Sequence, residues 1–378
     1  MTIAAIVLAL LGAVSIILNL WQWIAGFRFP LRGAPSGAGF CPAVSVLKPL
    51  KGCDAETERC LESWFRQEYA GHSELLFGVA SPGDPVCEIV RRLMQRYSMV
   101  KAKLVIASPL LGPNRKVSSL VYLSQRARHE HIVISDADVF AEKTFLSQVV
   151  SEMREETVGL VNCFYILAGP KNAAMRLEAI AVNADFWTQV LQALTLRKMD
   201  FALGAVVATK RSVLDRIGGF GGLLELLADD YQLGQRVSKS GPKLVICPFP
   251  VECRTQKQSG AAIWRHQLRW ARTVRVCQPV GYFFSILGNG TLWPALALLS
   301  GTALGTWIFS IGLTLRMLGA ISNYRKLTGR VDWWVAPLAP FKDVAQAVLW
   351  VASYAGNTVT WSGERFRVGR GGKLTPLA

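Results

Sequence analysis

Apolar and polar positions divide the chain into two hydrophobic ends and a mixed middle. Residues 2–27 contain no charged side chain, and this run is longer than the roughly 20 residues that a helix needs to cross a bilayer. Arg28 and Arg32 follow, and the positive-inside rule places what comes next in the cytoplasm. We therefore predict an N-terminal transmembrane helix within residues 1–30.

From residue 44 onward, short apolar strands alternate with helical stretches. Strands are predicted at 44–47, 74–79, 104–106 and 132–134, and helices at 57–67, 84–97 and 116–128. This alternation predicts an α/β domain with a mostly parallel, doubly wound sheet. Ligands in such folds bind beyond the carboxyl ends of the strands, so residues 48–52, 81–84 and 136–138 should converge on one crevice.

Two carboxylates on alternate residues end the strand in the stretch IVISDADVF, at Asp136 and Asp138. Hard divalent cations take oxygen ligands, and Mg2+ is usually held by one or two carboxylates together with substrate phosphates. The pattern predicts a metal site that grips a nucleotide diphosphate. A turn in which Asp136 caps the next helix is an equally simple interpretation.

A second acidic pair, Asp229 and Asp230, opens a predicted helix that runs to Lys239. Acidic residues in a first helical turn are favourable with the helix dipole alone, so capping explains Asp229 as well as any function does. Asp230 is the better candidate for a general base, because a second carboxylate nearby tends to raise a pKa.

The chain becomes amphipathic and then apolar after residue 260. Residues 262–277 predict a helix with Arg265, Arg269 and Arg272 on one face, suited to an anionic membrane surface. Residues 281–315 carry no charge and are long enough for two short spans or a hairpin broken near 301–305.

The last quarter of the chain ends in a basic tail. Residues 324–332 predict a basic loop, and residues 333–356 are an apolar stretch interrupted by prolines and charges. The basic tail should be cytosolic by the same charge rule. If loop and tail lie on one side, the stretch between them is a re-entrant or interfacial helix rather than a span.

Composition narrows the class of protein. Apolar residues make up 51% of the chain, the mean hydropathy is +0.29 and the formal net charge is +16. Zinc-finger spacings and RNP-like motifs are absent, so a membrane surface explains the charge better than nucleic acid does. The eight cysteines contain no C-x-x-C pair, which favours reduced thiols in a cytosolic domain. The first strand is followed by no G-x-G-x-x-G, which disfavours a redox dinucleotide fold.

An ordered set of motifs within residues 44–282 resembles one known family. The set is KPLKG, GDP at 83–85, GPNRK at 112–116, SDAD, an ALGA run, RIGGF, ADDY and QLRW at 267–270. This order is similar to ceramide glucosyltransferases, a lipid-directed branch of the inverting family-two glycosyltransferases with the GT-A fold. The resemblance implies a cytosolic GT-A domain at 42–260, an interfacial helix at 261–280, membrane segments at 281–357 and a cytosolic tail at 358–378, in a bacterial inner membrane.

The resemblance also implies roles for the matching residues. Asp230 would be the catalytic base with Asp229 beside it, and Asp138, more directly than Asp136, would bind Mg2+ or Mn2+. The acceptor would arrive through a groove beside Gly204 and Trp270. The nucleotide sugar would be bound by Lys48, Pro49, Asp84, Lys116, Asp136, Gln267, Arg269 and Trp270.

The implied reaction is transfer of glucose from UDP-glucose to the hydroxyl of ceramide, with inversion. Hopanoid glycosyltransferases resemble the same motif set, and transfer of N-acetylglucosamine from UDP-N-acetylglucosamine to a hopanoid polyol is the alternative. A processive polysaccharide synthase would need more helices for a translocation channel. A non-catalytic nucleotide-sugar binder would have no need of every candidate catalytic carboxylate.

Overall fold

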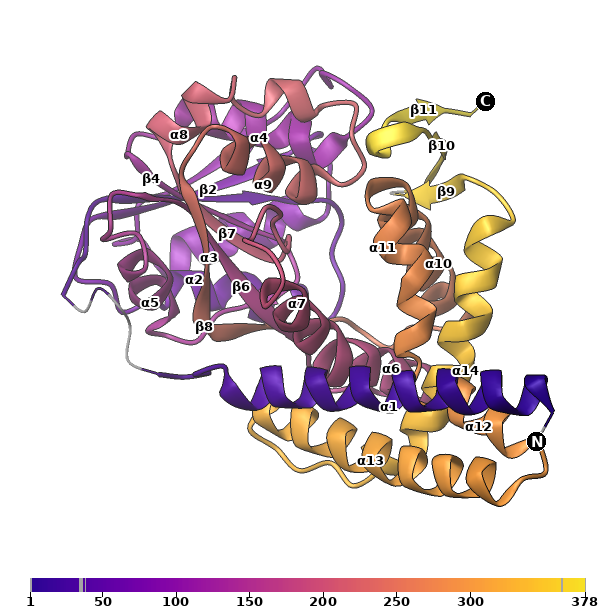
Figure 1. Ribbon diagram of the computed structural model, residues 1–378. Coiled ribbons are helices and arrows are strands. Elements are labelled where there is room, and N and C mark those ends of the chain that lie inside the picture. The colour runs from indigo at the N-terminus through magenta and orange to yellow at the C-terminus, as the bar shows by residue number, and fades with distance from the viewer. Residues whose placement is uncertain (1, 34–36, 38, 362, 378) are drawn as a thin grey trace.

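The computed structural model describes residues 2–33, 37, 39–361 and 363–377. A sheet of eight strands forms the centre of the described chain, in the order β3-β2-β1-β4-β7-β6-β8-β5 (Figure 1). The strands are β1 (Val44–Pro49), β2 (Ser73–Val79), β3 (Ala102–Ile106), β4 (His131–Ser135), β5 (Val139–Phe140), β6 (Val158–Leu167), β7 (Val206–Lys210) and β8 (Lys243–Cys253).

The sheet is mixed but mostly parallel, as the sequence predicts. Strand β1 pairs in parallel with β2 and β4, β2 pairs in parallel with β3, and β6 pairs in parallel with β8. Strand β7 runs antiparallel to β4 and β6, and the short β5 runs antiparallel to β8. The prediction that β1 ends at residue 47 was wrong, because the strand pairing with β2 continues to Pro49. Lys48 and Pro49 therefore lie within the strand and not beyond it.

Helices cover both faces of the sheet, because alternate strand residues point to opposite sides. Val44 and Val46 belong to one apolar core with α2 and α3, whereas Leu47 belongs to a second core with α4 and α9. The helices of this domain are α2 (Thr57–Phe65), α3 (Val86–Arg96), α4 (Arg115–Arg126), α5 (Phe145–Ser151), α6 (Ala173–Ile180), the π-helix η1 (Ala181–Phe186), α7 (Trp187–Leu194), α8 (Arg211–Arg216), the 3-10 turn η2 (Gly221–Leu223) and α9 (Asp229–Lys239).

Two described helices, α1 (Ile3–Arg28) and α13 (Ala303–Thr328), are long and apolar enough to cross a membrane. They run side by side along the lower edge of Figure 1, and α13 is preceded by the short α12 (Leu292–Leu298). The break predicted near residues 301–305 lies slightly earlier, at 299–302, because α12 ends at Leu298 and α13 already begins at Ala303. The predicted basic loop at 324–332 is shorter than expected, because α13 continues to Thr328 and ends at Gly329 with φ +74°.

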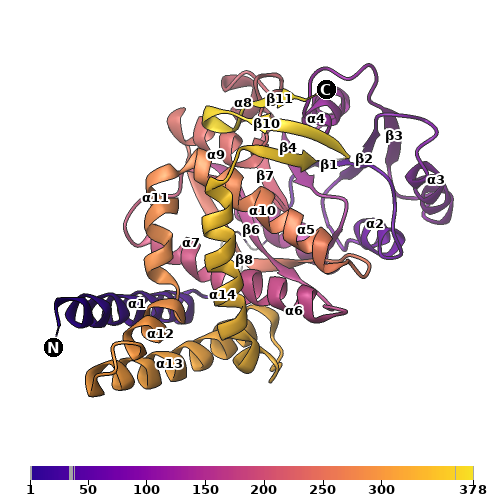
Figure 2. The same cartoon turned by 90° about the vertical axis from the view of Figure 1, so that its right-hand side faces the viewer.

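Three further helices stand across α1 and α13 in both views: α10 (Gly260–Cys277), α11 (Pro279–Phe284) and α14 (Val335–Tyr354) (Figures 1 and 2). The 3-10 turn η3 (Ser285–Gly288) follows α11. The crosswise direction of α14 agrees with an interfacial helix, which stays a prediction. The predicted amphipathic helix at 262–277 corresponds to α10.

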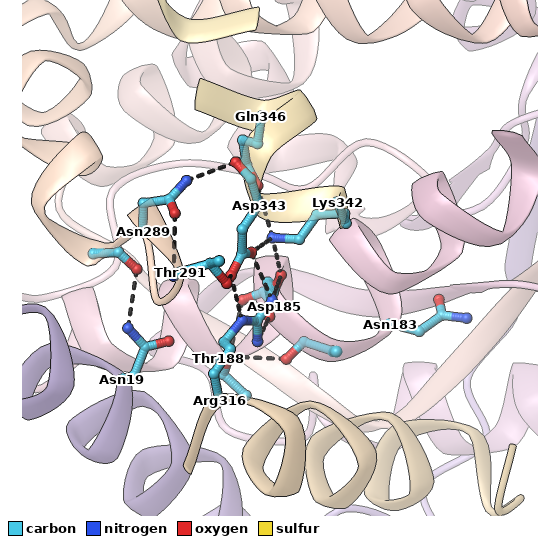
Figure 3. A network of polar contacts seen from close by, with 12 residues as sticks. Asn19, Asn183, Asp185, Thr188, Asn289, Thr291, Arg316, Lys342, Asp343 and Gln346 are labelled. Carbon is cyan, nitrogen blue, oxygen red and sulfur yellow. Dashed lines mark hydrogen bonds and ion pairs between the residues drawn. The ribbon is translucent and has the colours of Figure 1, made fainter. Parts of the chain in front are cut away.

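A charge-balanced group of side chains joins these helices to the domain (Figure 3). We call Asp185, Arg316, Lys342 and Asp343 the ion-pair quartet. Arg316 of α13 forms bidentate pairs with Asp185 of η1, at 2.9 Å, and with Asp343 of α14, at 2.8 and 2.9 Å. Lys342 lies 2.5 Å from Asp185 and 2.6 Å from Asp343. The two cations and two carboxylates therefore neutralise one another at a fully buried junction.

Residues 358–376, expected as a basic tail, contain a second sheet. Strands β9 (Thr358–Trp361), β10 (Glu364–Val368) and β11 (Leu374–Pro376) pair antiparallel in the order β11-β10-β9. Basic side chains occupy its exposed positions, while Phe366 and Val368 are buried. The tail is therefore a folded unit, which its charge pattern did not reveal.

Candidate active site

The turn after β4 carries Asp136 and Asp138 and is fixed mainly through its backbone. The ammonium group of Lys48 donates hydrogen bonds to the Asp136 carbonyl oxygen at 2.7 Å and to Ser135 Oγ at 2.9 Å. The Asp136 amide donates to the Ala205 carbonyl at 3.0 Å. Neither the Asp136 carboxylate nor the Asp138 carboxylate takes part in these hydrogen bonds.

Lys48 itself is completely buried beneath this turn. Burial lowers its pKa to about 8, against the raising effect of nearby acidic groups, and its ammonium lies 4.7 Å from the centroid of the Trp64 ring. Pro49 is buried beside it at the end of β1. The structure thus gives Lys48 a supporting position, and its predicted contact with the nucleotide stays a prediction.

Asp84 links two of the predicted loops. Its carboxylate accepts hydrogen bonds from the amide of Gly52, at 3.0 Å to each oxygen, and from the amide of Val86 at 3.0 Å. It therefore ties the loop after β1 to the first turn of α3. The predicted helix start at Asp84 was two residues early, because α3 begins at Val86.

Lys116, near the start of α4, connects the two acidic pairs. Its ammonium lies 2.6 Å from Asp136 Oδ1 and 3.6 Å from Asp229 Oδ2. Burial opposes its charge, but the carboxylates of Asp136, Asp229 and Asp230 outweigh that penalty and raise its pKa. The residues that the sequence assigned to separate motifs therefore meet around one cation.

Asn114 is a site residue that the sequence reasoning missed. Its Oδ1 caps α4 by accepting from the Val117 amide at 3.0 Å, while its Nδ2 donates to the Leu226 carbonyl at 2.7 Å and to Asp229 Oδ1 at 3.4 Å. One buried amide thus fixes both the helix that carries Lys116 and the loop before Asp229. An Asn directly before a helix is a common cap, and this signal could have found it.

Two carboxyl groups of the site have raised pKa values. Burial, with the neighbouring Asp136 carboxylate, raises the pKa of Asp138 to about 6. Burial, with the adjacent Asp229, raises the pKa of Asp230 to about 6. One Asp230 oxygen accepts the Tyr231 amide at 2.7 Å. A carboxylate with such a pKa can accept a proton near neutral pH.

Gly204 makes room for Asp230. Its φ of +88° is a left-handed conformation, and a Cβ placed on it would lie 2.3 Å from Asp230 Oδ2. A side chain at 204 would collide with the carboxylate. Gly204 also lines a small cavity with Lys116, Asp229 and Asp230. The structure therefore puts Gly204 directly beside the candidate base.

Helix α10 contributes Arg269 and Trp270 from its QLRW sequence. Burial lowers the pKa of Arg269, while Asp230, Asp136 and Asp229 act in the opposite direction, which places the guanidinium in the field of the acidic cluster. The Trp270 ring packs edge-on against Tyr165 at 6.3 Å between centroids.

Gln267, the first residue of the same sequence, is engaged elsewhere. Its Nε2 donates to Glu178 Oε1 at 2.8 Å, and Nδ1 of His266 lies 2.8 Å from the same oxygen. Glu178 therefore anchors the helix to α6. The predicted role of Gln267 with the nucleotide remains a prediction, and Glu178 was missed because nothing near it in sequence marks it.

The site contains more negative than positive charge. Its cations are Lys48, Lys116 and Arg269, against the four carboxylates of Asp136, Asp138, Asp229 and Asp230. Within the described residues, no group of three or more His, Cys, Asp or Glu side chains is arranged to hold a metal. Two neighbouring carboxylates do fit Mg2+ or Mn2+ when substrate phosphates complete the coordination. The residues present therefore suit a cation that arrives with a nucleotide.

Comparison with known proteins identifies the family of this chain. The profile of Glycosyl transferase family 21 matches residues 4–374. Ceramide glucosyltransferase 1 of Caenorhabditis elegans is 23% identical over 353 residues, covering 88% of this chain and 73% of the relative. A ceramide glucosyltransferase of Candida albicans is 30% identical over 118 residues, covering 28% of this chain and 22% of the relative.

Among solved structures, a mannosyltransferase from Pyrobaculum calidifontis in complex with GDP-Man and Mn2+ is similar, with a TM-score of 0.53 and 20% sequence identity. The match covers 92% of this chain and 98% of that structure, and it confirms the predicted GT-A fold. Because the family profile extends over residues 4–374, this chain belongs to Glycosyl transferase family 21 and is a glycosyltransferase.

Proposed function

We propose that the protein transfers a sugar from a UDP-sugar, with UDP-glucose as the favoured donor, to the hydroxyl of ceramide with inversion. The observation that carries this proposal is the position of Asp230, whose carboxylate lines one small cavity with Lys116 and Gly204 and has a pKa raised to about 6. The names of the relatives support the choice of acceptor, and the two long apolar helices support an acceptor within a membrane.

The reaction is a single displacement. Asp230 accepts the proton of the acceptor hydroxyl, whose oxygen attacks the anomeric carbon as the bond from that carbon to the diphosphate oxygen breaks. The new bond forms on the face opposite the leaving group, so the configuration inverts. No covalent intermediate is needed. The narrow space between Gly204 and the carboxylate limits its movement and so orients the base.

Positive charge is available for the departing diphosphate. The Lys116 ammonium lies 2.6 Å from Asp136 and 3.6 Å from Asp229. The Arg269 guanidinium of α10 interacts electrostatically with the same acidic cluster. Asp138 and Asp136 would hold a divalent cation, Mg2+ or Mn2+, which when bound neutralises phosphate charge. Lys116 holds the Asp136 carboxylate in place through their 2.6 Å contact, and charge-assisted hydrogen bonds from Lys116 and Arg269 retain the nucleotide.

The same proposal includes the location. Helices α1 and α13 anchor the protein in a membrane, the bacterial inner membrane, and the glycosyltransferase domain lies in the cytosol. Arg28, at the end of α1, supports this orientation through the positive-inside rule. The donor is a soluble nucleotide sugar and the acceptor is a bilayer lipid, so the site must face both phases.

The test is UDP release by the purified protein in mixed micelles. Ceramide and a hopanoid polyol are each offered with UDP-glucose and with UDP-N-acetylglucosamine, and Asp230→Asn is compared with Asp215→Asn, which changes an exposed aspartate of α8. We expect turnover with ceramide and UDP-glucose that Asp230→Asn abolishes and Asp215→Asn retains. Turnover with the hopanoid alone would show that the acceptor is a hopanoid and not ceramide. Turnover that survives Asp230→Asn would refute the assignment of Asp230 as the general base.

A further inference from the structure

The C-terminal sheet covers the loop that leads into Asp229 and Asp230. The Leu227 amide donates to the Gly372 carbonyl at 2.8 Å, and the Leu374 amide donates to the Glu225 carbonyl at 2.7 Å. These bonds flank an isolated antiparallel bridge between Leu226 and Lys373. Residues 225–227 are therefore held like an additional strand against the C-terminal segment, immediately before α9.

Leu227 also supplies a side chain to the core of this sheet. It is 5% exposed and packs with a small apolar cluster whose other buried members all come from the C-terminal segment: Val359, Phe366, Val368 and Leu374. Its Cα is only two residues from Asp229 and three from Asp230. The sheet and the acidic pair are thus connected through one buried leucine.

The same sheet contacts the other elements that supply site residues. Gln232 of α9 donates to the Gly371 carbonyl at 2.9 Å, Arg115 beside Lys116 pairs with Glu364, and Arg272 of α10 donates to the Thr358 carbonyl. Both views show the sheet beside α9 and above the end of α10 (Figures 1 and 2). Three separate parts of the site therefore meet at one C-terminal unit.

The sequence GRGGK at 369–373 permits this close approach. Gly371 and Gly372 have φ values of +66° and +84°, which favour glycine over other residues. A Cβ on Gly372 would lie 3.6 Å from Cys277 Sγ and 3.9 Å from the Ala228 amide nitrogen. The two glycines turn the chain so that their carbonyls reach Gln232 and Leu227.

We propose that residues 358–361 and 363–377 form a clamp that positions Asp229 and Asp230, with Leu227 as its main positioning residue. The inference rests on the proposed role of Asp230. The Asp136 and Asp138 turn is fixed separately, through Lys48 and Ala205. Loosening the clamp at Leu227 alone leaves its contacts with Arg115 and Arg272 in place. It should therefore lower kcat and leave the donor KM nearly unchanged, whereas general unfolding would change both.

The experiment compares Leu227→Ala with the near-isosteric Leu227→Met and with Arg365→Ala on the exposed face of β10. For each full-length variant, kcat, the KM for UDP-glucose and amide hydrogen exchange of residues 225–232 are measured. We expect Leu227→Ala to lower kcat about 10-fold to 100-fold, because small misplacements of catalytic groups cost this much. Its donor KM should stay within about twofold and its exchange should increase, while the other two variants behave like the parent.

Hydrogen exchange separates failure of the clamp from failure of the proposed function. If the parent protein transfers no sugar, the proposed function fails, and faster exchange at 225–232 in Leu227→Ala alone still supports the clamp. If Leu227→Ala keeps the parent kcat, or if its exchange does not change, the clamp is refuted. Equal losses in kcat and donor affinity would also refute it, because they indicate general damage.

Discussion

Two clusters of buried charge in this protein are built in opposite ways. The ion-pair quartet sets two cations against two carboxylates, each with an exposed side-chain fraction of 7% or less. The candidate active site sets Lys48, Lys116 and Arg269 against four carboxylates, and two of those carboxyls have pKa values raised to about 6. The charges of the first cluster balance within the chain, and those of the second leave an excess of negative charge.

This difference separates structural from functional charge. A buried ion pair is costly to break, because removal of one partner leaves the other charge uncompensated in an apolar environment. Buried carboxylates that outnumber the neighbouring cations destabilise the fold. Proteins retain such groups mainly at functional sites. Raised pKa values therefore favour the cluster at Asp230 and Asp138 as the candidate functional one, whereas the quartet joins the domain to helices α13 and α14.

The largest effect should come from removing the Asp138 carboxylate, the proposed metal ligand of the candidate active site. Asp138→Asn should lower turnover about 1,000-fold or more, because metal-assisted charge stabilisation contributes several kcal/mol. Binding of Mn2+ in the presence of UDP, followed by calorimetry, should weaken in parallel. Glu142→Gln, which changes an exposed acid seven residues after Ser135, is the matched control. Unchanged Mn2+ binding in Asp138→Asn would contradict the assignment.

The quartet predicts the opposite pattern, a loss of stability. Arg316→Leu leaves Lys342 alone with Asp185 and Asp343, so the protein should be destabilised by about 3–5 kcal/mol. Thermal unfolding in detergent, followed by circular dichroism, measures this change. Arg325→Leu, at an exposed position on the same helix, should unfold near the parent temperature. Equal shifts for the two variants would show that the quartet carries no special stability.

Gly204 offers a smaller and more local change. Gly204→Ala introduces a Cβ that would lie 2.3 Å from Asp230 Oδ2, so the carboxylate must move and kcat should fall about 10-fold to 100-fold. Gly219→Ala is matched, because its φ of +65° carries the same backbone strain but its Cβ would meet nothing within 4 Å. If both variants lose activity equally, strain and not collision is the cause.

The pH dependence of turnover should reflect Asp230 and is the mildest test. The base must be ionised to accept a proton, so kcat/KM should rise with pH and level off above about 6, where the raised pKa of Asp230 in the free protein lies. The measurement is kcat/KM between pH 5 and pH 8. A profile that is flat across this window, or one that falls from pH 5 to pH 7, would contradict the assignment.

The sequence predicted the functional cluster better than the structural one. Asp136, Lys116 and Asp230 stand at the ends of recognisable elements, and strand ends of a parallel sheet converge on one edge, so their meeting follows from topology. Asp185 and Arg316 are 131 residues apart and belong to segments with no shared pattern. From the sequence alone, Lys342 and Asp343 were therefore interpreted only as charged interruptions of an apolar stretch, and their ion pairs were not predicted.

Other parts of the structure were hidden for the same physical reason. The C-terminal sheet is stabilised by Leu227 and by a hydrogen bond from the Arg272 side chain of α10, and its own sequence shows mainly exposed arginines. Asn114 and Glu178 act through long-range hydrogen bonds, to Leu226 and to Gln267. Local periodicity reveals elements and their ends, whereas contacts between distant segments depend on packing that one sequence does not record.

The central claim is that the Asp230 cluster is arranged for chemistry at a cost in stability, and one variant tests both halves. Because folding raises the pKa of Asp230 from 3.8 to about 6, the carboxyl costs nothing when protonated in both states below about pH 4, and its full penalty applies above pH 6. Sugar transfer and thermal unfolding of Asp230→Asn are therefore measured together at pH 7.5. We predict a loss of turnover of at least about 100-fold and a gain of about 1–2 kcal/mol in stability. Retained turnover, or a lower unfolding temperature, would contradict the account.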